Sequence, residues 1–300
     1  MKMKKTLNVN TNYINALSRI FTPFVLDNIA EKGYSSYLSE VCANSNILQN
    51  IDNSLSFADF LNWIYNFLFK NFRNEYIYKN VIANKILLGK HSLNTSQMLT
   101  EFRVGKCKAD VVIINGTSNI YEIKSEFDSF NRLNNQLSSY MQVFDRINVV
   151  TSKHQAKKLL NELPESVGVF VVTHRNTIST IRDSVSNKKN IQPEVLFDSL
   201  RKNEYLNVIK SIYGGIPDVP NTYIFKECKT LFTKLKPDIA HDSTMTVLRQ
   251  RNENSFLGSI LRNAPNSLSA YIISNANNKK KLKALVERFT INIGKILVPA

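Results

Sequence analysis

Residues 108–125, KADVVIINGTSNIYEIKS, hold the pattern that decides the predicted fold. Two short apolar runs flank the dipeptide Asn115-Gly116, which is typical of the turn of a β-hairpin. Side chains alternate between the two faces of a strand, so Glu122 and Lys124 lie on one face of the second strand. The segment therefore predicts a hairpin with a carboxylate and an ammonium group side by side, and with Asp110 near the start of its first strand.

The sequence on both sides of this hairpin predicts an α/β fold. Apolar residues repeat with a helical period in some segments and alternate or run together, as in strands, in others. The last two predicted strands are apolar throughout, which indicates burial on both faces beside parallel neighbours. We expect a helix over residues 72–88, strands over 99–104, 109–114 and 120–124, a helix over 128–144, a strand over 147–151, a helix over 153–163 and a strand over 167–173.

The rest of the chain is expected to be helical. An apolar stripe over residues 54–70 carries aromatic side chains beyond one face, which predicts a helix packed on two sides. The polar segment SNKKNIQP, residues 186–193, is typical of a linker. We therefore predict an N-terminal helical region (1–70), a core (71–190) and a mostly helical, basic C-terminal domain (191–300).

The positive charge of the chain favours a polyanionic partner. Lys and Arg number 39 against 24 acidic residues, a net charge of +15, and such a surplus attracts phosphates and releases counterions. We expect nucleic acid as the partner, DNA rather than RNA, although a basic protein without a special partner has the same composition. The expected phosphate contacts near the C-terminus are Arg249, Arg251, Arg262 and the lysines of residues 279–283. The alternative is that these residues only solvate helices.

The sequence predicts a cytoplasmic protein without membrane contact. No apolar run approaches the roughly 20 residues that cross a membrane. The basic start MKMKK, residues 1–5, is not followed by the apolar segment of a signal peptide. Three cysteines lie far apart and leave an odd count, which suggests neither a zinc site nor a disulfide framework.

Asp110, Glu122 and Lys124 are the candidate catalytic residues. Two carboxylates supply the oxygen ligands that Mg²⁺ or Mn²⁺ prefers, and the sequence has no His or Cys cluster that would favour zinc. A divalent ion lowers the pKa of an attacking water, and a lysine beside it can position that water and offset charge in the transition state. The alternative is an ordinary E-x-K pair on a half-exposed strand, which is usually a solvated face.

Further residues support a site. Gln136 and Tyr140 are one turn apart on the helix after the hairpin. Glu75 lies on the apolar stripe of the preceding helix, where a carboxylate is seldom buried without a partner or a metal. Glu101, in the strand before Asp110, adds a fourth carboxylate. The simpler alternatives are a core tyrosine beside a boundary glutamine, a salt bridge for Glu75 and a solvent-facing Glu101.

Together these residues resemble the PD-(D/E)XK nuclease superfamily, particularly its RecB-like branch. There an Asp, an E-x-K and a downstream Q-x-x-x-Y lie on an α-β-β-β-α-β core. The resemblance covers about residues 73–151, with Ala109 in place of the proline of the superfamily's name. The segments RNEYIYKN and YEIKSEFDSF are also similar to a poorly characterised bacterial family, thought to occur among mobile-element and phage-defence genes.

This resemblance implies a restriction-endonuclease-like mixed sheet and a metal-dependent nuclease. The implied metal ligands, for Mg²⁺ or Mn²⁺, are Glu75, Asp110 and Glu122. The other implied site residues are Lys124, which would assist the water, and Gln136 and Tyr140, which would support the site or touch nucleic acid. The alternatives are a catalytically silent nucleic-acid-binding module and a structural subunit of a defence complex, with a partner protein from the same operon. Strandedness, mode of cutting and oligomeric state are left open.

The hairpin turn decides whether Asp110 and Glu122 share a face. A tight two-residue Asn115-Gly116 turn would pair Asp110 with Tyr121 and send Glu122 to the opposite face. Residues that pair across the hairpin lie on the same face, and every such pair has the same sum of residue numbers. For Asp110 and Glu122 to share a face this sum has to be even, which requires a loop with an odd number of residues. We therefore predict the less tight turn with an odd loop, for instance of three residues with Gly116 or its neighbour left-handed.

Overall fold

The structure, a computed structural model, is a mixed α/β chain. It describes residues 9–52, 54–251 and 254–298. The basic start at residues 1–5 lies outside the described residues. Within the described part of the chain, no helix has the length and apolar character needed to cross a membrane.

The chain divides into two compact units. We call them the helical unit, Met1–Asn84 with Asn254–Ala300, and the sheet unit, Lys85–Glu253. This grouping differs from the three regions expected from the sequence, because segments from both ends of the chain pack together in the helical unit. The helices after the sheet, up to residue 251, stay with the sheet.

The helical unit is organised around one strongly apolar helix, α4. Its residues Phe57, Phe60 and Trp63 are buried, as the two-sided packing predicted from the sequence requires. The C-terminal segment reaches the start of α4 through its backbone, where the amide of Phe57 donates to the carbonyl of Ile291 at 2.8 Å. The helices of this unit are α1 (Ile14–Ser18), α2 (Pro23–Lys32), α3 (Ser36–Asn44), α4 (Phe57–Asn71), α5 (Glu75–Ile82), α13 (Asn254–Asn263), α14 (Ser269–Ser274), α15 (Lys279–Arg288) and α16 (Ile293–Ile296).

The helix expected over residues 72–88 starts later and is interrupted. The side chain of Asn74 accepts a hydrogen bond from the amide of Ile77, so α5 begins after this N-cap. A π-helical turn, Ala83–Leu87, follows, and the short α6 (Leu88–Lys90) ends the element. The division between the two units falls inside the π-helical turn.

The sheet unit is built on a six-stranded mixed sheet with the strands in sequence order. Strands β1 to β3 are antiparallel, β3 to β5 are parallel, and β6 returns antiparallel. The predicted strands are thus confirmed, and β4 lies between parallel neighbours as predicted. The prediction is only half right for β5, because its other neighbour is the antiparallel β6, a strand whose short, partly exposed sequence gave no apolar signal. The strands are β1 (Gln97–Val104), β2 (Cys107–Ile114), β3 (Ser118–Lys124), β4 (Arg146–Ser152), β5 (Gly168–Val172) and β6 (Ile178–Arg182).

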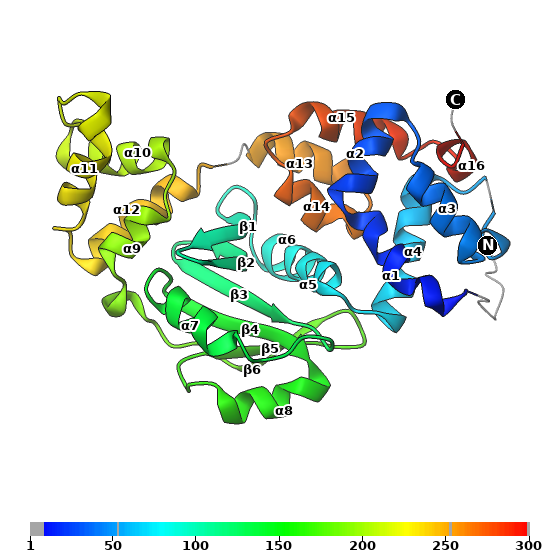
Figure 1. Cartoon of the computed structure of the whole chain (residues 1–300), viewed down its shortest axis with the longest axis horizontal. Helices are drawn as coiled ribbons and strands as arrows, with labels where there is room; N and C mark the ends of the chain where they lie inside the picture. The colour runs from blue at the N-terminus through cyan, green and yellow to red at the C-terminus, as the bar shows by residue number, and fades with distance from the viewer. Residues whose placement is uncertain (1–8, 53, 252–253, 299–300) are drawn as a thin grey trace. The chain divides into compact units, whose positions relative to one another are not determined.

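Helices α7 (Leu133–Met141) and α8 (Lys153–Glu162) cover the same face of the sheet (Figure 1). Leu137 of α7 and Leu159 of α8 join Val112 and Ile120 in one hydrophobic core. Because side chains alternate along a strand, this face is also that of the other even-numbered residues of β2 and β3. The helix predicted over residues 128–144 begins only at Leu133, since the chain first forms a loop.

The β2–β3 hairpin has an odd loop, as predicted, of three residues. Val111 pairs with Tyr121 and Ile114 with Ser118, so paired residue numbers add up to 232. The loop is residues 115–117, and Gly116 takes a φ of +89°, a left-handed conformation that glycine adopts without steric cost. The even sum places Asp110 and Glu122 on one face of the sheet, as predicted.

The helices after the sheet belong to the same unit. The segment 186–193, predicted to be a linker, is instead held against the core. The side-chain amide of Asn187 donates to the carbonyls of Met141 and Phe144, at 2.6 and 3.0 Å. The helices that follow are α9 (Pro193–Asp198), α10 (Lys202–Tyr213), α11 (Asn221–Phe232) and α12 (Pro237–Leu248).

A polar network, buried at Ser118 and His241, joins α12 to β3. Nε2 of His241 lies 2.8 Å from the hydroxyl of Ser118, and its Nδ1 lies 2.7 Å from a carboxylate oxygen of Asp242. Asp242 also forms an ion pair with Lys188 at 2.8 Å. Ser118 and His241 are both fully buried, so this Ser-His-Asp arrangement cannot receive a substrate and has a structural role.

Candidate functional site

Side chains from β3 and α7 meet on the face of the sheet that α7 covers. The ammonium group of Lys124 donates to Oε1 of Glu122 at 2.8 Å and to Oε1 of Gln136 at 2.9 Å. The hydroxyl of Tyr140 lies 2.9 Å from Oε2 of Glu122 and 2.7 Å from the carbonyl oxygen of Lys108. The structure thus brings four of the predicted site residues into one hydrogen-bonded network.

Asp110 is held beside this network by the backbone of β3. Its Oδ2 accepts a hydrogen bond from the amide of Ile123 at 2.7 Å. The backbone pairing of β2 with β3 ends at Val111 and Tyr121. Beyond this pair, the side chain of Asp110 accepts the hydrogen bond of the Ile123 amide on β3. One further step in this register sets Asp110 opposite Glu122, since 110 and 122 also add up to 232.

Burial dominates the electrostatics of the site. The side chain of Glu122 is 2% exposed, and burial raises the pKa of its carboxyl group, against the lowering effects of the Lys124 charge and of hydrogen bonds from Lys124 and Tyr140. Burial also raises the pKa of Tyr140 far above its usual range, and the charges of Glu122 and Asp110 raise it further. The tyrosine is therefore a permanent hydrogen-bond donor, and Glu122 is a carboxylate that is costly to leave without a cation.

Glu101 interrupts the pairing of β1 with β2 at the position opposite Asp110. Thr100 pairs with Val111 and Phe102 with Ala109, but between them Glu101 has a φ of +53°. Such a left-handed conformation costs a non-glycine residue roughly 1–2 kcal/mol. Conformations of this kind are concentrated at functional sites.

The unusual backbone of Glu101 leaves its carboxylate close to Asp110. A carboxylate oxygen of Glu101 lies within 4.8 Å of one of Asp110. The side chain of Glu101 is 48% exposed, with the ammonium group of Lys108 at 3.9 Å. Glu101 is therefore exposed, as the simpler alternative expected, and still within reach of a site at Asp110. Nothing in the sequence signals its conformation, because glutamate has no preference for positive φ.

Glu75 belongs to the helical unit. It is the first residue of α5, its side chain is 54% exposed, and it forms an ion pair with Lys79 one turn along the helix. The carboxylate is thus exposed rather than buried, and the salt bridge considered for it is present. Its assignment as a metal ligand stays a prediction.

Two of the expected phosphate contacts are engaged inside the protein. The guanidinium group of Arg251 donates to both carboxylate oxygens of Glu204, at 2.6 and 2.8 Å, and lies over the ring of Phe102. Lys281 forms ion pairs with Asp27 and Glu31. Arg251 and Lys281 therefore have structural roles, whereas the exposed basic residues of the predicted set include Arg249, Arg262, Lys280 and Lys283.

Comparison with known proteins places the chain in a family. A family model described as "Bacteriophage P4 protein cII" matches residues 69–272, more than half of the chain. The chain belongs to the bacteriophage P4 protein cII family. The region matched to this family includes every predicted site residue, from Glu75 to Tyr140.

One individual relative agrees with this assignment. Protein cII of Enterobacteria phage P4 is 25% identical over 196 residues, which cover 61% of this chain and 71% of that protein. Among solved structures, a protein of unknown function from Silicibacter pomeroyi is 16% identical and matches with a TM-score of 0.29. That match covers 42% of this chain and 87% of the other. A TM-score of this size does not establish a shared fold.

Proposed function

We propose that this member of the P4 cII family is a divalent-metal-dependent nuclease that hydrolyses phosphodiester bonds, with DNA favoured over RNA. The observation that supports this most is the common face of Asp110, Glu122 and Lys124 on two neighbouring strands. The sequence order of α5, β1, β2, β3, α7 and β4 agrees with the α-β-β-β-α-β order of the PD-(D/E)XK superfamily. We therefore also propose a restriction-endonuclease-like topology for the core.

The donor groups fit a hard divalent ion such as Mg²⁺ or Mn²⁺. Asp110 and Glu122 would hold the ion, with Glu75 as a further predicted ligand and Glu101 as a ligand suggested by its proximity to Asp110. Oxygens bound to one Mg²⁺ lie roughly 3–4 Å apart, because each is about 2.0–2.1 Å from the ion. A small side-chain movement thus suffices for Glu101 and Asp110 to share an ion. When bound, the ion polarises the phosphate and lowers the pKa of an attacking water.

The other side chains of the network act on position and charge. The ammonium group of Lys124 donates a hydrogen bond to the attacking water or to a phosphate oxygen and offsets the negative charge of the transition state. Gln136 holds the ammonium group on the side facing α7. Tyr140 donates a hydrogen bond to the carboxylate of Glu122, so this ligand is already oriented before the reaction begins.

Cleavage assays with the purified full chain test this proposal. End-labelled linear and closed circular DNA and RNA are incubated with Mg²⁺ or Mn²⁺, and with EDTA as the metal-free control. We expect cutting that requires the divalent ion and is lost in Asp110→Asn, while cutting of circles identifies an endonuclease. Binding without cutting under all these conditions would instead support the nucleic-acid-binding module. A role in phage defence, or as a subunit beside a partner protein, stays a prediction from the resemblance.

A further inference from the structure

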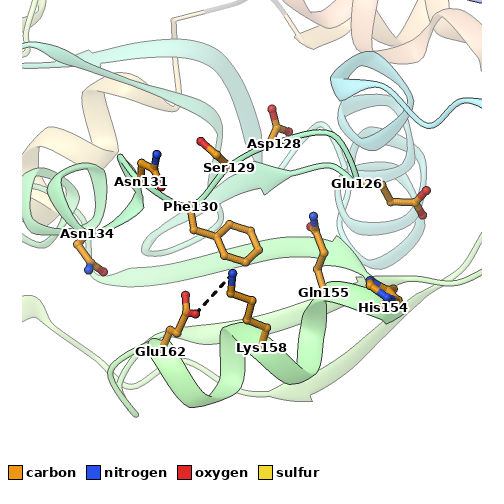
Figure 2. Close-up of a pocket in the computed structure, with 10 residues that line it drawn as sticks. All are labelled: Glu126, Asp128, Ser129, Phe130, Asn131, Asn134, His154, Gln155, Lys158 and Glu162. Atoms are coloured by element: carbon orange, nitrogen blue, oxygen red, sulfur yellow. Dashed lines mark ion pairs between the residues drawn. The ribbon is translucent and has the colours of Figure 1, made fainter.

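A cavity lies beside the carboxyl end of β3, next to the candidate site. Its volume is about 600 Å³. Its walls come from two segments of the sheet unit, residues 126–134 in the loop after β3 and the start of α7, and residues 154–162 on α8 (Figure 2). Ligands of α/β proteins commonly bind outside the carboxyl ends of neighbouring parallel strands, here β3 and β4. The volume is in the range of pockets that hold a small organic group.

One aromatic ring and several amides give this cavity its chemistry. Phe130 contributes the ring, which is partly buried. The ammonium group of Lys158 lies over this ring, 5.0 Å from its centroid, so a base that stacks there displaces it. Asn131, Asn134 and Gln155 contribute side-chain amides to the wall (Figure 2). Nucleobases stack on aromatic rings, and an amide can donate to and accept from the edge of a base at the same time.

The charges of the wall argue against a phosphate as the occupant. The wall has three carboxylates and, among its basic side chains, one lysine and one histidine. The carboxylates are those of Glu126, Asp128 and Glu162, and the basic residues are Lys158 and His154. Lys158 also lies 3.8 Å from a carboxylate oxygen of Glu162, so its charge is already offset. A neutral ring with hydrogen-bonding edges suits such a wall, whereas a phosphate would be repelled.

The cavity is joined to the candidate site through one threonine. The hydroxyl of Thr151 lies 2.8 Å from the carbonyl oxygen of Lys124 and 2.9 Å from the amide oxygen of Gln155. Gln155, in the wall of the cavity, is thus linked through the Thr151 side chain to the backbone of Lys124. Lys124 is the residue proposed to assist the water. A base bound here belongs to a nucleotide close to the bond that is cut.

We propose that this cavity binds one unpaired nucleobase, stacked on Phe130, and so selects single-stranded nucleic acid or a frayed end. This inference rests on the proposed nuclease function and adds its substrate class. A base inside a duplex is stacked and paired, and it cannot enter the cavity without leaving the helix.

Binding measurements in EDTA test the cavity apart from catalysis. The probe is a short single-stranded DNA with one 2-aminopurine, followed by fluorescence, and a blunt duplex of the same length is the comparison. Phe130→Leu keeps an apolar side chain but removes the ring, and we expect it to weaken single-strand binding about tenfold, within the usual range for loss of base stacking. Asn134→Ala should weaken it about twofold to tenfold, as for one lost hydrogen bond. Tyr223→Leu is the matched control, because Tyr223 is an exposed aromatic residue on α11 of the same unit.

The outcomes separate the two proposals. The base pocket is overturned if Phe130→Leu and Asn134→Ala both bind single strands as strongly as wild type, with thermal unfolding unchanged. It is also overturned if the wild-type chain shows no detectable binding. Metal-dependent cutting would leave the nuclease proposal standing in that case. Single-strand binding that depends on Phe130, without cutting in Mg²⁺ or Mn²⁺, would support the pocket and overturn the nuclease.

Discussion

The ammonium group of Lys124 lies 2.8 Å from Oε1 of Glu122, and both side chains are buried, at 9% and 2% exposure. A lysine in this position is already desolvated and needs no further ordering to act on a water or phosphate beside Glu122. We expect Lys124→Ala to lower the cutting rate by at least about 100-fold, the usual effect of removing one positioned donor. Binding of nucleic acid in EDTA should be retained.

The control for this substitution is Lys106→Ala, which removes an exposed lysine from the neighbouring β1–β2 turn. It should cut at the wild-type rate. Lys124→Ala also leaves Glu122 buried without its cation, so its thermal unfolding has to be measured alongside. A folded Lys124→Ala protein that cuts as fast as wild type would remove Lys124 from the site.

The left-handed backbone at Glu101 predicts that Glu101→Gly impairs activity without lowering stability. Glycine adopts a φ of +53° without steric cost, so the free energy of unfolding should be unchanged or higher. Loss of the carboxylate should raise the Mg²⁺ concentration needed for half-maximal cutting. Arg103→Gly, in the regular part of β1, is the control and should destabilise the protein by roughly 0.5–1 kcal/mol. An unchanged Mg²⁺ requirement in Glu101→Gly would exclude Glu101 as a ligand.

Removal of the Tyr140 hydroxyl should change the pH dependence of cutting. Burial raises the pKa of Glu122, and the hydrogen bond from Tyr140 counteracts part of this effect. A ligand carboxylate has to be ionised, so activity falls as pH drops through the pKa of Glu122. In Tyr140→Phe that pKa is higher still, and the acid limb of the pH–rate profile should move to higher pH. A limb that stays in place would indicate that another group controls it.

The buried His241 predicts a loss of stability in mild acid. Burial is the largest influence on its pKa and lowers it below the usual value of 6.5, although the neighbouring Asp242 raises it. The unfolded chain therefore takes up a proton at a higher pH than the folded one. The stabilising contribution is complete above about pH 6.5 and is lost as pH falls from there through the lowered pKa.

Thermal unfolding between about pH 5 and pH 8 checks this expectation. The melting temperature of the wild type should fall more steeply toward acid than that of His241→Gln. His174→Gln, which changes an exposed histidine, should keep the wild-type slope. Equal slopes in wild type and His241→Gln would assign the acid sensitivity to other groups.

Two exposed lysines of α15 provide a test of phosphate binding. Each phosphate contact contributes about 0.7–0.9 to the slope of log affinity against log salt concentration. Replacing Lys280 and Lys283 with Ser should reduce this slope accordingly and leave the metal requirement unchanged. Lys281→Ser is the control for structural damage, because Lys281 is paired with Asp27 and Glu31. An unchanged slope in the double variant would leave phosphate binding to other parts of the chain.

Local sequence patterns predicted much of the fold. The strands, and the parallel pairing of β4 with its neighbours, followed from short apolar runs. The odd hairpin loop was predicted from the requirement that Asp110 and Glu122 share a face, and the structure has it. The spacing of Gln136 and Tyr140 predicted that one helix carries both to the site. The ends of α5 and α7 were predicted less well, because capping residues and loop hydrogen bonds decide where a helix starts.

By itself, the sequence determined the strands and the shared face of Glu122 and Lys124, because both depend on neighbours along the chain, and the net positive charge, which depends on composition alone. The structure decided that Asp110 lies on the same face, because the length of the hairpin loop sets the register. Only the tertiary structure decided the contacts between distant residues. Ser118 and His241 are 123 residues apart, Arg251 is bound by Glu204, and Glu101 is left-handed opposite Asp110. Such contacts depend on how whole elements pack. They contribute substantially to stability only after burial has brought the groups together in a region of low dielectric constant.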